Sequence, residues 1–305
     1  MDLVYQSHQV FKMKKIIYLL VLSCLAISCE TIEGPYLTDN QNSNNTDETV
    51  KKILIEDYTG HLCPNCPEAA RELEAIHDVY GDQIIGMAIH VTTAFARPYP
   101  ASQTPKFQYD FRTQWGDEWD DLFSVSDLGL PKGMINRTGY TNDSYRLGKD
   151  EWLERVQEEL VKEPEIKIDV TSNNQGNITI EATCLNDIAH SLKLAICLTE
   201  NQIINWQKDG SIEDEDYIHN HVLKTVLYDD LLSEQNNYLV NDIITKDVSF
   251  NITSLEDYNN NYSLNIAQQG NGNSDNWNIN NISIVAYIYD PTTYEILQVE
   301  EKHLN

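Results

Sequence analysis

Basic residues are scarce in this chain of 305 residues. It has 21 Lys and Arg against 48 Asp and Glu, which gives a formal net charge of -27. Nucleic-acid phosphates are bound through clustered basic side chains, so this balance excludes nucleic acid as a partner. The negative charge is most simply that of a solvated acidic surface.

Long apolar runs are also lacking beyond the first thirty residues, which argues against a transmembrane helix in the remainder. The exception lies at the start, where Met13-Lys14-Lys15 precedes an almost wholly apolar stretch that ends at Ser28-Cys29. A basic beginning, a short apolar core and a small residue predict a secretory signal over residues 1–29. Met13 is then a candidate for the true start.

Cys29 ends the apolar core in a particular context. The run Ala26-Ile27-Ser28-Cys29 resembles a bacterial lipoprotein box, in which the cysteine becomes the lipidated N-terminus. That resemblance implies a lipid anchor at Cys29 and attachment to a membrane without spanning it. Residues 30–50, rich in Asn, Thr, Asp and Glu, are expected to form a flexible tether. An ordinary signal peptide with an incidental cysteine is the alternative.

Cysteine is sparse as well, which excludes a disulfide-dense scaffold. Beyond Cys29 the chain keeps Cys63, Cys66, Cys184 and Cys197. The first two form a CxxC motif that follows a short apolar run and opens a segment with apolar residues at helical spacing. The expected order is strand, tight turn and helix, with the motif at the helix N-terminus. The helix dipole and the free N–H groups there would favour Cys63 as a thiolate.

Three interpretations compete for this CxxC motif. A zinc site requires about four ligands, and no second CxxC or suitably spaced histidine pair follows, while His61 lies too close in the turn to complete a cage. No metal is therefore expected. A static disulfide suits an oxidising compartment and remains open. A redox-active dithiol is favoured, because the motif lies between a strand and a helix.

The segment from Ile53 to Cys66 resembles the active site of thioredoxin-like proteins. The resemblance implies that Asp57 is a buried carboxylate that relays protons, that Cys63 attacks, and that Cys66 resolves the mixed disulfide. It also implies that Pro131, after Leu130, is a cis-proline that helps to position an extended substrate chain. Protein thiols or disulfides would then be the partners, and no cofactor is required. Leu62 and Pro64-Asn65 replace the usual Trp and Gly-Pro, which leaves the redox potential open.

The fold class predicted is an α/β thioredoxin-like domain over residues 51–163, followed by an all-β sandwich, Ig-like, over residues 164–305. In the first half, a buried strand is expected over residues 84–91 and a closing helix over residues 147–161. His90, at the end of that strand, is expected to be a packed or exposed residue without a catalytic role. The aromatic insertion at residues 92–127 could form a peptide-binding wall, although a local core is favoured.

The second half shows period-two alternation, which predicts short strands. The alternating segments are Ile166–Val170, Ile178–Ala182, Leu192–Ile196 and Ile282–Tyr289. Residues 254–280 are rich in Asn and are expected to form a long solvated loop. A disulfide between Cys184 and Cys197 is left open, since simple hairpin register does not place them opposite each other. His219 and His221 would share one face of a strand, but a structural role is favoured over a metal site because no third ligand is evident.

Together these features resemble the Omp28-related outer-membrane lipoproteins of the Bacteroidetes. The resemblance is carried by Glu56–Gly60 with the CxxC motif, by Leu130–Arg137, by Tyr217–Leu223 and by Val285–Tyr287. It implies an outer-membrane lipoprotein of the cell envelope, facing the periplasm or the surface. The leading hypothesis for activity is thiol–disulfide exchange through Cys63 and Cys66. A non-enzymatic structural or binding lipoprotein with a static disulfide is the alternative.

Overall fold

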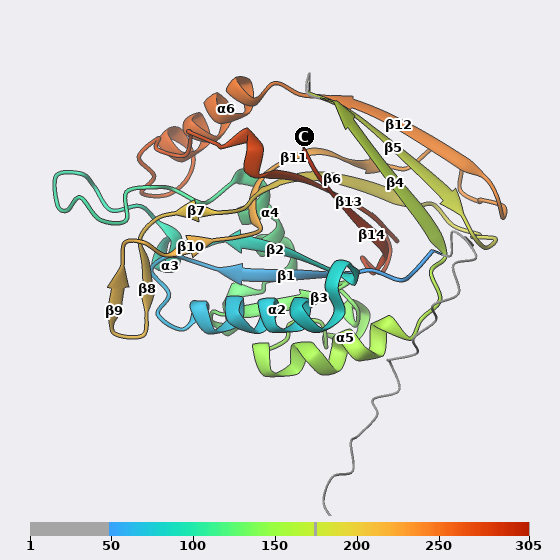
Figure 1. Ribbon diagram of the computed structural model, residues 1–305, viewed down its shortest axis with the longest axis horizontal. Helices are drawn as coiled ribbons and strands as arrows, with labels where there is room; N and C mark the ends of the chain where they lie inside the picture. Colours follow the sequence, from blue (N-terminus) through green and yellow to red (C-terminus); the bar gives the residue numbers. More distant parts are fainter. Residues whose placement is uncertain (1–48, 174–175, 305) are drawn as a thin grey trace, which may run out of the picture. The chain divides into compact units, whose positions relative to one another are not determined.

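The computed structural model describes residues 49–173 and 176–304, which belong to one compact unit (Figure 1). The predicted signal segment 1–29, the lipidation site Cys29 and almost all of the predicted tether 30–50 lie outside the described residues. Among those described, no helix is both long and apolar enough to cross a membrane.

A seven-stranded mixed sheet forms the centre of this unit, in the order β14-β13-β6-β11-β2-β1-β3. The strand β1 pairs in parallel with β2 and antiparallel with β3, while β11 meets β2 in parallel at a single register, Val222 opposite Ala88. The remaining neighbours pair antiparallel. The strands are β1 (Ile53–Thr59), β2 (Ile84–His90), β3 (Lys132–Ile135), β6 (Lys193–Glu200), β11 (Val222–Leu231), β13 (Ile282–Tyr289) and β14 (Ile296–His303).

This sheet joins the two halves of the sequence. Three of its strands come from residues 51–163 and four from residues 164–305, and they are hydrogen-bonded in one continuous ladder. The boundary expected at residue 163 is therefore not a boundary of the sheet. The sequence did not reveal this, because the apolar pattern of a buried strand does not indicate which other strand it pairs with.

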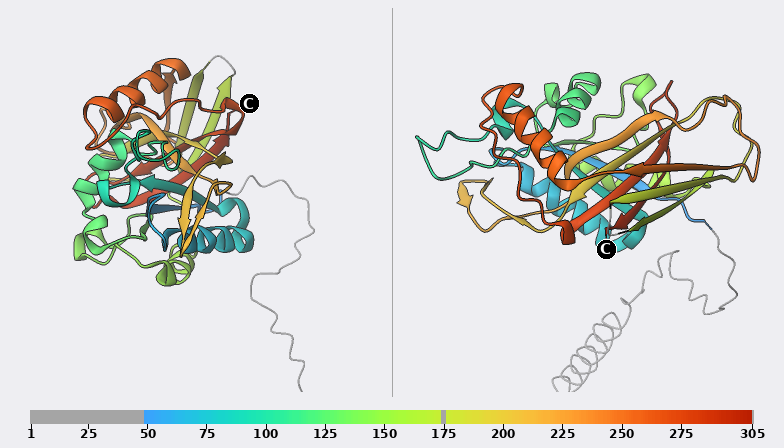
Figure 2. Two further views of the ribbon diagram at one scale, coloured as in Figure 1. Left: turned by 90° about the vertical axis from the view of Figure 1, so that its left-hand side faces the viewer. Right: turned by 90° about the horizontal axis from the view of Figure 1, so that it is seen from above.

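Helices cover both faces of the β1–β3 side of the sheet (Figures 1 and 2). The helices α2 (Cys66–Tyr80) and α5 (Trp152–Leu160) pack on one face, around a core that includes Leu73, Ile76 and Trp152. The helix α4 (Gln114–Phe123) contributes Trp119 and Phe123 to the core on the opposite face. The predicted strand over residues 84–91 and the predicted closing helix are confirmed, although α5 is shorter than expected and follows a 3-10 turn.

Five short helical segments complete the first half, and one 3-10 turn and one longer helix lie in the second half. The α-helix α3 (Thr93–Ala96) lies in the aromatic insertion. The 3-10 turns are Gly81–Gln83, Ser126–Leu128, Tyr140–Asn142, Lys149–Glu151 and Ile279–Asn281. The helix α6 (Ile252–Asn265) lies in the segment expected to be a solvated loop, so that prediction was wrong. Asn is a weak helix former, but Asn251 caps the helix by accepting a hydrogen bond from the Ser254 N–H at 3.0 Å.

The period-two segments form strands, as predicted, in two facing sheets. The smaller, three-stranded sheet has the order β12-β5-β4, with β4 (Ile166–Asn173), β5 (Asn177–Cys184) and β12 (Ile243–Ser249). Its inward residues, such as Ile168 and Ile180, share one core with Ile196 and Ile284 of the large sheet. The fold is thus a mixed α/β arrangement with one large sheet and smaller sheets.

Two pairs of short strands lie between β6 and β11 in the sequence. The strand β7 (Ile203–Ile204) pairs with β10 (Ile218–His219), and β8 (Gln207–Asp209) pairs with β9 (Ile212–Asp214) as a hairpin. In Figure 1 the β8–β9 hairpin lies beside the end of the sheet from which the chain enters α2.

Cys184 and Cys197 are both free and buried. Cys184 ends β5 of the small sheet, whereas Cys197 lies in β6 of the large sheet. The disulfide left open between them is therefore absent, and burial raises the pKa of both thiols. They are packed core residues with no access to solvent.

The two ends of the described unit are joined by a clasp. Just before β1, the backbone N–H of Lys52 donates to the Gln298 side chain at 3.0 Å, and Gln298 donates to the Val50 carbonyl at 2.9 Å. The Lys52 ammonium also pairs with Glu300 at 2.5 Å. These residues tie the start of the described chain to β14.

Candidate functional site

The CxxC motif lies in the turn between β1 and α2, as predicted. Cys63 and Cys66 are joined by a disulfide with their Cα atoms 5.4 Å apart, and each residue is only 1% exposed. The helix begins at Cys66, with Asn65 as its N-cap. The expectation that Cys63 lies on the helix N-terminus therefore needs correction, because it is Cys66 that occupies the first turn.

Gly60 allows the aromatic insertion to approach this turn closely. A Cβ atom at residue 60 would stand 2.3 Å from the Phe95 carbonyl oxygen, which no side chain tolerates. That carbonyl accepts a hydrogen bond from the Leu62 N–H at 2.8 Å. The approach therefore fixes the turn from the side of the insertion.

Asp57 lies on β1 and is 3% exposed. Burial raises the pKa of its carboxyl group to about 8, so the group is protonated at neutral pH. Among the described residues its Oδ1 atom has no hydrogen-bond partner. A buried, protonated carboxyl group with an unused oxygen can give and take a proton, which agrees with the role that the thioredoxin resemblance implies.

The Leu130–Pro131 peptide bond is cis, as predicted. Pro131 directly precedes β3, whose Lys132 lies opposite Tyr58 of β1. This register places Pro131 beyond that pair, towards the end of β1 that leads into the CxxC turn. Its predicted role in positioning a substrate is not tested by this geometry.

The β8–β9 hairpin covers the CxxC turn, which the sequence did not predict. The Lys208 N–H donates to the His61 carbonyl at 2.9 Å, and the Gly210 N–H donates to the Pro64 carbonyl at 2.8 Å. The Gln207 side chain donates to the Cys63 carbonyl at 3.1 Å. These bonds place the hairpin along the turn in the manner of an added strand.

An ion pair holds the same hairpin to the CxxC helix. The Arg71 guanidinium of α2 contacts the Asp209 carboxylate at 2.9 and 3.4 Å through two of its nitrogens. Both side chains are partly exposed, so this pair contributes only modestly to stability. Its geometry nevertheless fixes where the hairpin crosses the helix.

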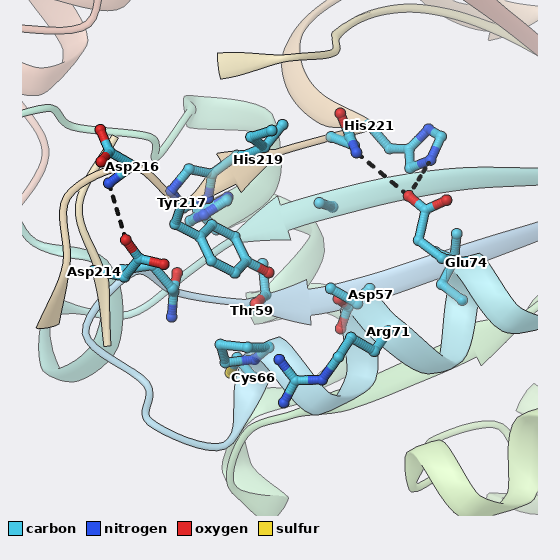
Figure 3. Close-up of a pocket in the computed structure, with 18 residues that line it drawn as sticks. Asp57, Thr59, Cys66, Arg71, Glu74, Asp214, Asp216, Tyr217, His219 and His221 are labelled. Carbon is cyan, nitrogen blue, oxygen red and sulfur yellow. Dashed lines mark hydrogen bonds and ion pairs between the residues drawn. The ribbon is translucent and has the colours of Figure 1, made fainter. Parts of the chain in front are cut away.

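A pocket of about 410 Å³ opens beside Cys66, between α2, the ends of β1 and β2, and the segment from Gln207 to His221 (Figure 3). Asp57 and Cys66 both line this pocket, whereas Cys63 and Pro131 do not. Figure 3 shows the labelled side chains of both chain halves converging on this space. The structure thus brings together Asp57 and Cys66 and leaves Cys63 beneath the hairpin.

Residues 117–305 match the family model described as outer membrane protein Omp28. The chain belongs to the Omp28 family. This confirms the resemblance inferred from the sequence and places the protein in the outer membrane of the cell envelope. The matched residues do not include Cys63 or Cys66, so membership alone does not assign a chemistry to the CxxC motif.

Two solved structures share the overall fold of this Omp28-family protein. HBP35 of Porphyromonas gingivalis aligns with a TM-score of 0.55 at 15% identity, over 84% of this chain and 76% of that one. A structural-genomics target protein from Agrobacterium tumefaciens aligns with a TM-score of 0.50 at 10% identity, over 85% and 96%. A domain of the outer membrane lipoprotein Omp28 from Porphyromonas gingivalis gives 0.25 at 15% identity, over 47% and 89%. No curated protein matches the sequence.

Two buried histidines, His90 and His219, line the pocket of this Omp28-family protein, and a third, His61, is buried in the CxxC turn. The sequence analysis had assigned none of them a place in a site. Phe111 of the insertion lies 4.6 Å from the rings of both His90 and His219, and Phe107 stacks on His61 at 5.7 Å. Burial lowers the pKa of His61 and of His219 to about 3, and it lowers the pKa of His90 well below its usual value, so all three are neutral at pH 7. The aromatic residues of the insertion are therefore largely a local core, as favoured.

His219 and His221 do not share one face of a strand, so that prediction was wrong. His219 ends β10, and the chain turns at Asn220 and His221 before β11, so the two rings separate. His221 faces Glu74 of α2 at 3.6 Å. In residues 49–173 and 176–304, no group of three potential ligands is placed to hold a metal ion.

Proposed function

We propose that this protein is an outer-membrane lipoprotein, anchored through Cys29, whose thioredoxin-like part carries out thiol–disulfide exchange at Cys63 and Cys66. The observation that carries the proposal is the placement of Cys66 and a protonated Asp57 on the wall of one pocket, next to a closed CxxC disulfide. The order of β1, α2 and β2, with a cis-proline before the antiparallel β3, supports the thioredoxin-like assignment.

In the proposed cycle, one cysteine of the reduced pair attacks a substrate disulfide as a thiolate, and the other resolves the resulting mixed disulfide. The protonated Asp57 gives its proton to the Cys66 thiolate when the disulfide is opened, and the resulting carboxylate takes the proton back when the Cys66 thiol ionises again. Its raised pKa suits this task, because a group that titrates near the working pH both gives and takes a proton readily. The substrates would be thiols or disulfides of the envelope compartment.

The proposal is tested by the reduction potential of the Cys63–Cys66 pair, measured on the chain from residue 30 in glutathione or dithiothreitol buffers. A value of roughly -120 to -270 mV, where exchange catalysts lie, supports the oxidoreductase. Replacement Cys63→Ser should then abolish turnover of a model disulfide. Turnover that continues undiminished in this variant would refute the proposed cycle.

A static disulfide in a binding or structural lipoprotein is the second candidate. It is favoured by the near-complete burial of both cysteines and by the hairpin hydrogen bonds across the turn. A potential below about -300 mV, as found for structural disulfides, would select this function.

A further inference from the structure

We propose that the pocket beside Cys66 binds a low-molecular-weight aminothiol or its disulfide, and that Cys66 is the cysteine that this substrate reaches. The inference rests on the exchange function proposed above and names its substrate class. It departs from the expectation drawn from the sequence, in which Cys63 attacks and the partner is a protein.

Only one of the two cysteines borders the pocket. Cys66 lines the pocket of about 410 Å³ and Cys63 does not, although the two are joined. The carbonyl of Cys63 is bound by Gln207 of the hairpin, and that residue is itself buried. Cys66 is therefore the residue of the pair that borders the pocket, although each cysteine is only 1% exposed.

The second observation concerns what is kept out. An extended polypeptide docks through main-chain hydrogen bonds to its receptor. In the CxxC turn, the carbonyls of His61 and Pro64 are already bound by the N–H groups of Lys208 and Gly210. The hairpin thus occupies two backbone carbonyls of the CxxC turn with which a substrate chain could otherwise pair. A small molecule has no such requirement, and the pocket volume lies within the range of small-ligand sites.

The third observation concerns the polarity of the pocket. Ala70, Leu73 and Ala88 give it an apolar wall. Asp214 and Asp216 also line it, and among the described residues neither has an ion-pair partner. A ligand with an apolar, sulfur-containing end and a cationic end matches this division.

Two buried polar atoms provide independent support for a ligand. The Asp57 Oδ1 and His219 Nε2 atoms belong to residues that line the pocket and are 3% and 5% exposed. Neither atom has a hydrogen-bond partner within the described chain. Buried polar atoms are rarely left without partners, so these two are available to a bound molecule.

The exchange step balances without any further reagent. In the reduced protein, the Cys66 thiolate attacks one sulfur of the small disulfide, a Cys66–substrate disulfide forms, and the substrate S–S bond breaks to release one thiolate, which takes up a proton. The Cys63 thiolate then attacks the Cys66 sulfur and releases the second thiol. The protein dithiol is oxidised and one disulfide is reduced to two thiols; excess thiol drives the reverse reaction.

Single-cysteine variants test the proposal. Cys63→Ser, which keeps Cys66, and Cys66→Ser, which keeps Cys63, are each mixed with cystamine, and the adducts are followed by mass spectrometry with peptide mapping. We expect the adduct at Cys66 to form about tenfold faster than that at Cys63. Equal rates, or faster reaction at Cys63, would overturn the assignment. Limiting iodoacetamide on the reduced natural chain gives the same ranking without a substitution.

The charge preference needs a second comparison. The rate of adduct formation at Cys66 is measured with cystamine and with the uncharged bis(2-hydroxyethyl) disulfide. The ratio of the two rates should be higher in the folded protein than in the protein unfolded in urea. The double variant Asp214→Asn/Asp216→Asn should reduce this preference by about threefold to tenfold, since each exposed charge contributes little. Asp121→Asn/Asp127→Asn, which removes two charges outside the pocket, should leave it unchanged. An equal loss in both double variants would show that only the net charge of the protein matters and would overturn the aminothiol class.

The test of the pocket assignment can fail independently of the test of the exchange function. Neither single-cysteine variant can form the Cys63–Cys66 disulfide, so their adduct rates do not depend on its reduction potential. A strongly reducing potential in the natural chain would refute exchange and leave the pocket result standing. An adduct rate at Cys66 no faster than at Cys63 would refute the pocket assignment and leave the measured potential as it is.

Discussion

Replacement of Asp57 by asparagine should stabilise the protein increasingly as the pH rises. Asparagine has nearly the shape of a protonated aspartic acid and cannot ionise. Burial raises the pKa of the Asp57 carboxyl group from 3.8 to about 8 in the folded chain. Between these two values the folded state keeps a proton that the unfolded state has lost, so the stability of the natural protein falls with rising pH.

The size of the effect follows from the shift in pKa. Each pKa unit corresponds to about 1.4 kcal/mol, so a shift of roughly four units gives an upper bound of about 6 kcal/mol. Because Asp57 lines a pocket where the surroundings can relax, we expect about half of that value, or about 2 to 3 kcal/mol at pH 8. At pH 4 the two proteins should differ little.

Urea denaturation of the oxidised chain from residue 30, at unit steps from pH 4 to pH 9, provides the measurement. Other groups with shifted pKa values, such as Asp117 and Lys51, titrate in both proteins. The difference between the two unfolding free energies therefore isolates Asp57. Parallel stability curves for the natural protein and Asp57→Asn would refute the claim that this carboxyl group is neutral in the folded state.

Three further substitutions test the framework of the site. Arg137→Met removes the partner of Glu56, which is fully buried and bound at 2.7 and 2.9 Å, and should lower the unfolding free energy by about 3 to 5 kcal/mol. Gly133→Ala places a Cβ atom 2.6 Å from the Trp152 ring and should cost about 1 to 3 kcal/mol in the same measurement. Below pH 6.5 the unfolded chain binds a proton at His219, whereas the folded chain keeps this residue neutral to about pH 3. The unfolding free energy therefore falls as the pH is lowered, and His219→Gln should reduce this slope by up to about 1.4 kcal/mol per pH unit.

Each of these substitutions has a matched control on the surface. Arg155→Met breaks the partly exposed pair with Glu158 and a hydrogen bond to the Thr138 carbonyl at 2.9 Å, and should cost about 1 to 2 kcal/mol, less than the loss of the buried pair. Gly148→Ala meets only the flexible ends of two side chains and should be nearly neutral. His190→Gln, at an exposed site, should change the unfolding free energy at pH 7 by no more than about 0.5 kcal/mol. Losses as large in the controls as in the buried variants would contradict the packing that we describe.

The parts of the site that are local in sequence could be predicted from the sequence. The CxxC turn, the helix α2 and the strand β2 each follow from residues within a short window, whereas the cis bond before Pro131 was expected only from the thioredoxin resemblance. Apolar spacing, helix-stop residues and the order of strand, turn and helix fix such features with little help from the rest of the chain. Membership of the Omp28 family was likewise evident from short motifs.

The parts that depend on distant pairing could not be predicted. Gln207 lies 144 residues from Cys63 in the sequence, and the residue pattern of the β8–β9 hairpin does not indicate which turn the hairpin contacts. The strand β11 pairs with β2 at a single pair of residues, so the pairing produces no pattern in the sequence of either strand. His219 was identified as unusual, but a metal site was the function weighed for it. A short aromatic stretch such as residues 107–111 was the available signal that buried rings would gather there.

The clasp between residues 50–52 and β14 also determines which bonds a pulling force on the N-terminal side would reach first. A pull that enters the described unit at residue 49 reaches the bonds to Gln298 and Glu300 before it reaches β1. Because β14 is itself hydrogen-bonded along β13, the pull is shared by a second strand of the sheet. The first bonds to break under tension are therefore the clasp bonds, and the CxxC turn at the far end of β1 is mechanically sheltered.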